Sequence, residues 1–134
     1  MAALLLTTPA IAANNPWLGT WILKLSDAGQ KPETLIYSDA GGGAMRMVSV
    51  EDKSGIVTHF NSKPALDTGA GATHQHALAI TSTSPTSYTW TLFRNGTPWV
   101  RGRNVLAANH KSFREVSWLI AKPGQKLTFV YERR

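Results

Sequence analysis

The sequence predicts an all-β protein, an antiparallel up-and-down β-barrel of about eight to ten strands. Apolar and polar residues alternate with a period of two along most of the chain, and no long stretch has the period of a helix. Turn signals such as Asn95-Gly96 and Pro123-Gly124 leave only runs of strand length between them. A sheet of that many strands with one apolar face closes on itself, because closure buries that face and removes the sheet edges.

The expected strands follow one another with short connections. In the first strand, Trp21, Leu23 and Leu25 alternate onto one face. The glycines at 41–43 and the segment 52–55 are turn signals, and residues 62–72 are expected to form the longest loop. No internal repeat and no second domain is visible. The expected strands span residues 17–25, 33–38, 44–51, 56–61, 74–81, 87–94, 97–103, 112–120 and 126–133.

Composition limits the classes of function. A chain of 134 residues fits one domain that buries a core without cross-links. The absence of cysteine excludes disulfides, zinc–thiolate sites and thiol nucleophiles. Lysine and arginine number 14 against 8 for aspartate and glutamate, which favours anionic partners. The positive charges are scattered and form no known nucleic-acid signature, so nucleic acid is not the expected partner. The oligomeric state is left open.

The N-terminal residues 1–13 have the character of the end of a secretory signal. A short apolar segment is followed by small residues around Ala10 and Ala12. The alternative is a disordered apolar tail, since a segment this short does not span a bilayer and no other stretch is a candidate membrane span. We therefore expect residues 14–134 to form the single barrel domain and the protein to work in the periplasm or outside the cell.

The hairpin around Asn95-Gly96 predicts a cavity. An Asn-Gly pair between alternating runs is typical of a two-residue type I′ turn. In an uninterrupted register, Trp90 lies opposite Arg101 and Tyr88 opposite Arg103. Aromatic rings interleaved with arginines are expected to form the wall of a pocket with a polar end. The alternative is an outer face on which arginine stems cover tryptophan rings. The face in question carries Tyr88, Trp90, Leu92, Trp99, Arg101 and Arg103.

Two short segments resemble calycin-type barrels. Leu18-Gly19-Thr20-Trp21 resembles the Gly-x-Trp opening strand of lipocalins and intracellular fatty-acid-binding proteins, and residues 130–133 resemble the closing strand of the latter. Those proteins hold a ligand carboxylate with an Arg-x-Tyr pair. Tyr131 matches the tyrosine of that pair, whereas Phe129 occupies the arginine position. The resemblance implies a barrel whose closing strand contacts a ligand.

A longer resemblance, over nearly the whole of the chain after residue 13, is to small exported bacterial lipocalin-like proteins without a settled activity. The shared features are a Gly-Thr-Trp start, a glycine turn at 37–43, an Asp-x-x-Gly hairpin at 52–55, the Asn-Gly hairpin and a closing Val-Tyr-Glu. This resemblance implies that Tyr88, Trp90 and Leu92 face the interior, and with them Trp99, Arg101 and Arg103 of the same face.

His74 and His76 form the clearest candidate for chemistry. Alternation puts both imidazoles on the face shared with Leu78 and Ile80. They could move a proton or orient a ligand, or they could simply line the mouth of the barrel. A metal site would need a third ligand, and no residue stands at a diagnostic spacing, so we expect no metal and no cofactor.

Glu115 alternates with Phe113 on a strand next to the arginines. If Phe113 faces inward, so does Glu115, and an internal arginine would be its natural partner because an unpaired buried charge is costly. An exposed carboxylate is the alternative.

The leading hypothesis is an exported barrel that binds a small amphipathic or anionic molecule in its interior, with an arginine holding the anionic end. One alternative is a cofactor-free barrel enzyme, an isomerase, cyclase or lyase, in which His74 or His76 moves a proton and an arginine steadies negative charge. Another is an adaptor with a packed interior. The predicted ligand-binding residues are Tyr88, Trp90, Trp99, Arg101, Arg103, Glu115, Phe129 and Tyr131.

Overall fold

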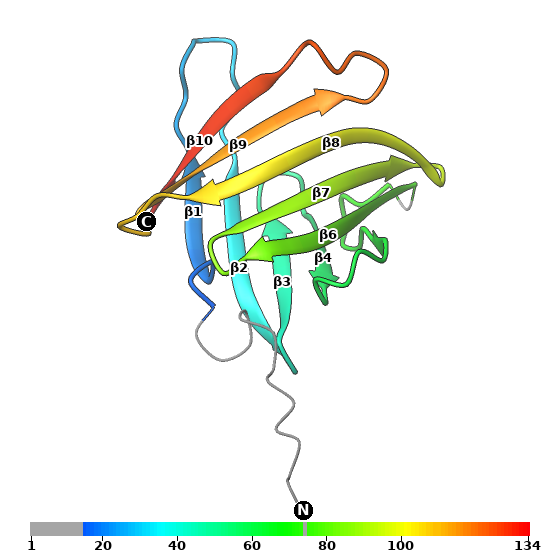
Figure 1. Cartoon of the computed structure of the whole chain (residues 1–134), viewed down its shortest axis with the longest axis horizontal. Coiled ribbons are helices and arrows are strands. Elements are labelled where there is room, and N and C mark those ends of the chain that lie inside the picture. Colours follow the sequence, from blue (N-terminus) through cyan, green and yellow to red (C-terminus); the bar gives the residue numbers. More distant parts are fainter. Residues whose placement is uncertain (1–14, 74) are drawn as a thin grey trace, which may run out of the picture.

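The structure, a computed structural model, describes residues 15–73 and 75–134. These residues form ten antiparallel strands and no helix, in one sheet that curls into a nearly closed barrel (Figure 1). The predicted all-β up-and-down barrel is confirmed. The expected signal segment, residues 1–13, lies outside the described residues, as does His74. The strands are β1 (Gly19–Leu23), β2 (Thr34–Gly41), β3 (Ala44–Ser49), β4 (Ser54–Thr58), β5 (Ala65–Leu66), β6 (His76–Ser84), β7 (Ser87–Arg94), β8 (Thr97–Leu106), β9 (Ser112–Leu119) and β10 (Leu127–Arg133).

Each strand pairs with its neighbour in the chain, except that β4 and β5 stand at the two edges of the sheet. β1 also pairs with β10, so the order is β4-β3-β2-β1-β10-β9-β8-β7-β6-β5. Residues 62–72, expected to be a loop, contain the two-residue strand β5 and help to close the barrel. Ala65 pairs with Leu78 of β6. Two backbone hydrogen bonds of 2.9 and 2.8 Å then join Gly55 of β4 to Thr68. This segment therefore covers the edges that β4 and β6 would otherwise leave unpaired.

The turn between β7 and β8 has the predicted type. Asn95 and Gly96 have φ values of 51° and 78°, the two positive values that a type I′ turn needs. Arg94 pairs with Thr97 directly across it. An Asn-Gly pair adopts these angles at low cost, because glycine has no Cβ and asparagine tolerates the left-handed region.

One pair further along, the hairpin contains a β-bulge that the sequence analysis did not predict. Pro98 lies opposite Phe93, but the next pair joins Val100 to Leu92, so Trp99 is an extra residue without a partner. Proline has no backbone N–H to give to a ladder, and for that reason it is found at bulges and edges. The bulge moves every later residue of β8 to the opposite face.

The predicted pairs of Trp90 with Arg101 and of Tyr88 with Arg103 are therefore wrong. Both arginines lie opposite threonines of β7 on the outer face, and both are exposed. Gly102 takes the interior position opposite Trp90. The inner wall of this hairpin is aromatic and neutral rather than aromatic and basic.

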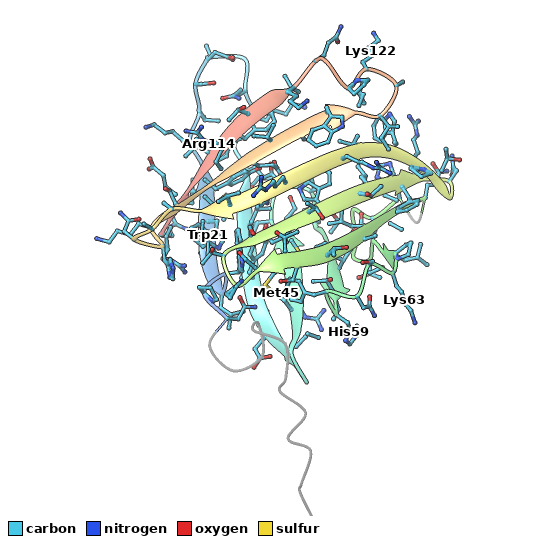
Figure 2. The ribbon with its side chains drawn as sticks, in the orientation of Figure 1. Trp21, Met45, His59, Lys63, Arg114 and Lys122 are labelled. Atoms are coloured by element: carbon cyan, nitrogen blue, oxygen red, sulfur yellow. The ribbon has the colours of Figure 1, made fainter. Side chains whose placement is uncertain are left out.

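Aromatic side chains close one end of the barrel. Trp17 is fully buried, with its ring centroid 5.4 Å from that of Phe113, and Trp21 lies 5.0 Å from the same ring. Arg133 lies 4.1 Å above the Trp21 ring and donates hydrogen bonds of 2.6 and 2.7 Å to carbonyl oxygens in the segment before β1. Figure 2 shows Trp21 and Met45 inside the barrel near this end. The core therefore fills the closed end and leaves room toward the other.

Candidate functional site

The barrel contains a cavity of about 250 Å³, which lies toward the end opposite the one closed by Trp17, Trp21 and Phe113. Glu33, Ser49 and Ser54 line its edge, and all three stand at strand ends on that side. Its walls combine an apolar group with a polar group. The apolar group is Leu35, Met47, Val48, Ile56, Leu78 and Trp90, and the polar group includes Glu33, Tyr37, Tyr88, Asn104, Glu115 and Tyr131.

Trp90 forms one wall of this cavity and is held by its two neighbours on β8. A Cβ atom on Gly102 would lie 2.2 Å from the Trp90 ring, so only glycine leaves space for the indole. The Trp90 Nε1–H donates to Oδ1 of Asn104 at 2.9 Å. The amide of Asn104 in turn donates to the Tyr88 hydroxyl at 2.9 Å. These contacts fix the orientations of Trp90, Asn104 and Tyr88.

A second polar group lies across the cavity. The Tyr131 hydroxyl donates to Oε2 of Glu33 at 2.8 Å, which ties β10 to the start of β2. Burial raises the pKa of Glu33, and the Tyr131 hydrogen bond partly opposes the rise. The pKa of the Tyr131 hydroxyl is raised by its own burial and by the charges of Glu115 and Glu33. Tyr131 is therefore a neutral donor at physiological pH.

Glu115 is the most unusual side chain of the cavity. It lies on β9 between Asn104 of β8 and Phe129 of β10. Burial raises the pKa of its carboxyl group to about 7, the charge of Glu33 adds to the rise, and the Asn104 amide opposes it. The arginine expected as its partner is absent from the interior, because the bulge turns Arg101 and Arg103 outward. Among residues 15–73 and 75–134, the single ion pair joins Lys24 to Glu132 on the surface.

The predicted binding residues separate into three groups. Tyr88, Trp90, Glu115 and Tyr131 line the cavity. Phe129 packs against the core cluster beside it. Trp99, Arg101 and Arg103 do not contribute to it, since the arginines face outward and Trp99, 39% exposed, lines a separate hollow.

His76, the first residue of β6, does not line the cavity. Its ring is stacked at 6.1 Å on Trp99. His74, its proposed companion, lies outside the described residues. Among the residues that are described, no three histidine, aspartate or glutamate side chains come close enough to hold a metal ion. The titratable groups that face the cavity and could bind or react with a ligand are therefore Glu33 and Glu115, not the histidines.

Three further residues that line the cavity were not predicted from the sequence: Glu33, Tyr37 and Asn104. Glu33 contacts Tyr131 of β10 and Tyr37 contacts Tyr88 of β7, and no local pattern reveals contacts between residues so far apart in the chain. Asn104 had a local signal, because it alternates with Gly102, and glycine within a strand often marks the close approach of another group. Had Gly102 been matched with the bulky Trp90, Asn104 would have been placed inside.

The outward placement of the arginines gives a first prediction. Arg101→Met and Arg103→Met are each expected to melt like the parent, because neither exposed guanidinium has a hydrogen-bond or ion-pair partner to lose among the described residues. Arg133→Met is the contrasting variant, and it should lose about 1–3 kcal/mol because several carbonyl hydrogen bonds disappear. Thermal and urea unfolding measure both effects. A loss for Arg101→Met as large as that for Arg133→Met would contradict the outward placement.

The comparisons with known proteins do not identify a family. No protein-family model matches the chain, and no curated protein matches it significantly. Within the described ranges, no helix is long and apolar enough to cross a membrane. What the barrel binds is therefore inferred from its own residues.

Proposed function

We propose that this chain is a lipocalin-like binding protein whose barrel holds a small amphipathic molecule by a positively charged nitrogen. The observation that carries the proposal is the buried carboxyl group of Glu115, which faces a cavity and has no cation beside it among the described residues. An anionic ligand, the sequence-based hypothesis, would place its charge beside two carboxyl groups. With the arginines outside, nothing in the described interior compensates that charge.

An ammonium group offers what the polar side of the cavity lacks. A buried carboxylate without a partner is costly, and an N–H donor with positive charge converts that cost into a charge-assisted hydrogen bond. Glu33 and Glu115 together supply up to four acceptor oxygens, enough for the three protons of a primary amine. The ring of Trp90 adds an aromatic surface that can contact the positive charge of the ligand or its alkyl chain.

The apolar side of the cavity accounts for the rest of the ligand. Leu35, Met47, Ile56 and Leu78 give a surface for a short alkyl or aromatic body. The volume of about 250 Å³ lies just below the usual range for small-molecule pockets, roughly 300–1,000 Å³. The ligand is therefore small, or its tail extends through the open end.

The test compares three molecules that share a chain and differ in the head group: octylamine, octanol and octanoate. Titrations are followed by tryptophan fluorescence at pH 8. Octylamine is expected to bind at least about tenfold more tightly than octanoate, since hydrogen bonds to a charged group contribute about 1.5–3 kcal/mol. Glu115→Gln should weaken octylamine binding by a similar factor and leave octanol binding unchanged.

Glu132→Gln, on the outer face of the neighbouring strand, is the matched control and should change neither affinity. Equal affinity for octylamine and octanoate, or an undiminished octylamine affinity in Glu115→Gln, would exclude the proposal.

A second candidate function is proton transfer by a cofactor-free enzyme. The observation that favours it is the carboxyl group of Glu115, whose pKa of about 7 suits a general base or acid at neutral pH. In this candidate function, Glu115 takes the proton-transfer role that the sequence suggested for His74 or His76. Native mass spectrometry of protein from its own host separates the candidates, because a binding protein returns a bound molecule unaltered and an enzyme converts it on rebinding.

We also propose that the protein acts outside the cytoplasm. The apolar residues 1–13, with small residues at their end, support export. N-terminal sequencing of the mature protein from its host is the test, and retention of residues 1–13 would count against export.

A further inference from the structure

Two adjacent segments at the open end of the barrel form a distinctive tip. The tip consists of residues 92–101, around the β7–β8 turn, and residues 117–127, around the β9–β10 loop. Val100 pairs with Leu119, and the backbone N–H of Ile120 donates to the carbonyl oxygen of Trp99 at 3.0 Å, so the segments are held together. Figure 1 shows both connections at the same end of the sheet, and Figure 2 shows Lys122 on the β9–β10 loop pointing away from the strands.

The tip exposes large apolar side chains. Leu127 is 61% exposed, and Leu119 and Trp99 are each 39% exposed. Together with Trp118 they surround a hollow of about 260 Å³ that shares no lining residue with the interior cavity. Single exposed apolar residues are ordinary on a protein surface, but a cluster around a hollow indicates contact with something apolar.

Every charge on the tip is positive. Its two segments carry Arg94, Arg101, Lys122 and Lys126, and they contain no aspartate or glutamate. Arg94 lies 5.2 Å from the centroid of the Trp99 ring. Lys126 lies 4.9 Å from the centroid of the Trp118 ring.

The asymmetry extends along the sheet. Residues 75–134 hold nine lysines and arginines but only two acidic residues, Glu115 and Glu132. Of these, Glu115 faces the interior cavity. The remaining acidic residues, six in number, all precede residue 68, so the positive potential is concentrated on the side of the molecule that ends in the tip.

We propose that the tip is a docking site for an anionic lipid membrane. Leucine and tryptophan beside lysine and arginine are the composition of surfaces that rest in the headgroup region, with the apolar groups inserted and the cations on the lipid phosphates. A nucleic acid would satisfy the cations but would leave the exposed leucines in water. The proposal does not depend on the ligand of the interior cavity, although docking would turn the open end of the barrel toward the bilayer.

The test is flotation of the full chain with vesicles of two compositions at low ionic strength. One is phosphatidylcholine alone, and the other is phosphatidylcholine with phosphatidylglycerol in equal parts. Binding to the anionic vesicles is expected to be at least about tenfold tighter and to weaken as salt is added. Lys122→Gln with Lys126→Gln should weaken it by about tenfold or more, and Leu119→Ser with Leu127→Ser should weaken it comparably.

The chain offers matched controls for both changes. Val105 is 38% exposed on β8 and pairs with Ser87, at the opposite end of the β7–β8 hairpin from the tip, so Val105→Ser should leave vesicle binding unchanged. Lys24→Gln, on the connection between β1 and β2, is the corresponding charge control. Thermal melting establishes that each variant is folded.

Three outcomes would overturn the proposal. The first is that anionic vesicles bind no better than neutral ones. The second is that the tip variants bind like their controls. The third is that RNA or heparin binds as tightly as the vesicles and is unaffected by the leucine substitutions, which would identify a soluble polyanion as the partner.

Discussion

Replacing Gly102 with alanine is expected to lower the free energy of unfolding by about 1–3 kcal/mol, the usual range for overpacking a filled site. The added methyl group would lie 2.2 Å from carbon atoms of the Trp90 indole. A rigid ring fixed by a hydrogen bond to Asn104 cannot move aside without breaking that bond. Trp90 would leave the wall of the cavity, so ligand affinity should fall together with stability.

The control for this change is Gly124→Ala. Gly124, in the loop between β9 and β10, has no atom within 4 Å of its hypothetical Cβ. Its replacement should leave the urea midpoint and the tryptophan emission spectrum unchanged, whereas Gly102→Ala should alter both. Equal midpoints for the two variants would mean that Trp90 does not pack on Gly102, and the register of β7 against β8 would have to be different.

Stability is expected to fall as pH rises from about 5 to about 8, and Glu115 is the cause. The folded protein holds this proton with a pKa of about 7, above the ordinary value of 4.5 that applies to the unfolded chain. Between those two values the folded state binds more protons, so raising the pH favours unfolding. The shift corresponds to about 3 kcal/mol, fully lost above pH 7. The raised pKa of Glu33 acts in the same direction.

Glu115→Gln should remove most of this dependence, because an amide does not ionise. We compare the free energies of unfolding of the variant and the parent, measured with urea at pH 5 and pH 8. The value for the variant minus the value for the parent should therefore be larger at pH 8 than at pH 5. Glu132→Gln, in an exposed position, should follow the parent at both pH values. A difference between parent and Glu115→Gln that is the same at pH 5 and pH 8 would show that Glu115 titrates normally and is not buried.

The fold could be predicted because its signals are local. The Asn95-Gly96 turn and the glycines at 41–43 each determine the geometry of a few residues, and strict alternation supplies the strands between them. Given these, closure follows from the need to cover an apolar face. The two residues of β5 escaped prediction because their pairing with β6 depends on the gap left at the edge of the barrel.

The site was only partly predictable, because a single bulge decides which residues of β8 face inward. Trp99, Arg101 and Arg103 were expected in the cavity, and one extra residue beside Pro98 moved them out of it. Two local signals for the bulge were present. Pro98 stands next to the turn, and Gly102 is small enough to lie opposite the bulky Trp90. The approach of Glu33 to Tyr131 has no local signal, since 98 positions separate them in the chain.

The most direct test of the proposed amine site is the titration of Glu115 by carbon NMR, in protein labelled at the glutamate carboxyl carbons and with the resonance assigned through Glu115→Gln. In the free protein the midpoint should lie near 7. An ammonium group bound beside the carboxylate favours its ionised form, so saturating octylamine should lower that midpoint by about one unit or more. An unchanged or higher midpoint at saturation would contradict the account, because the amine would then be bound elsewhere.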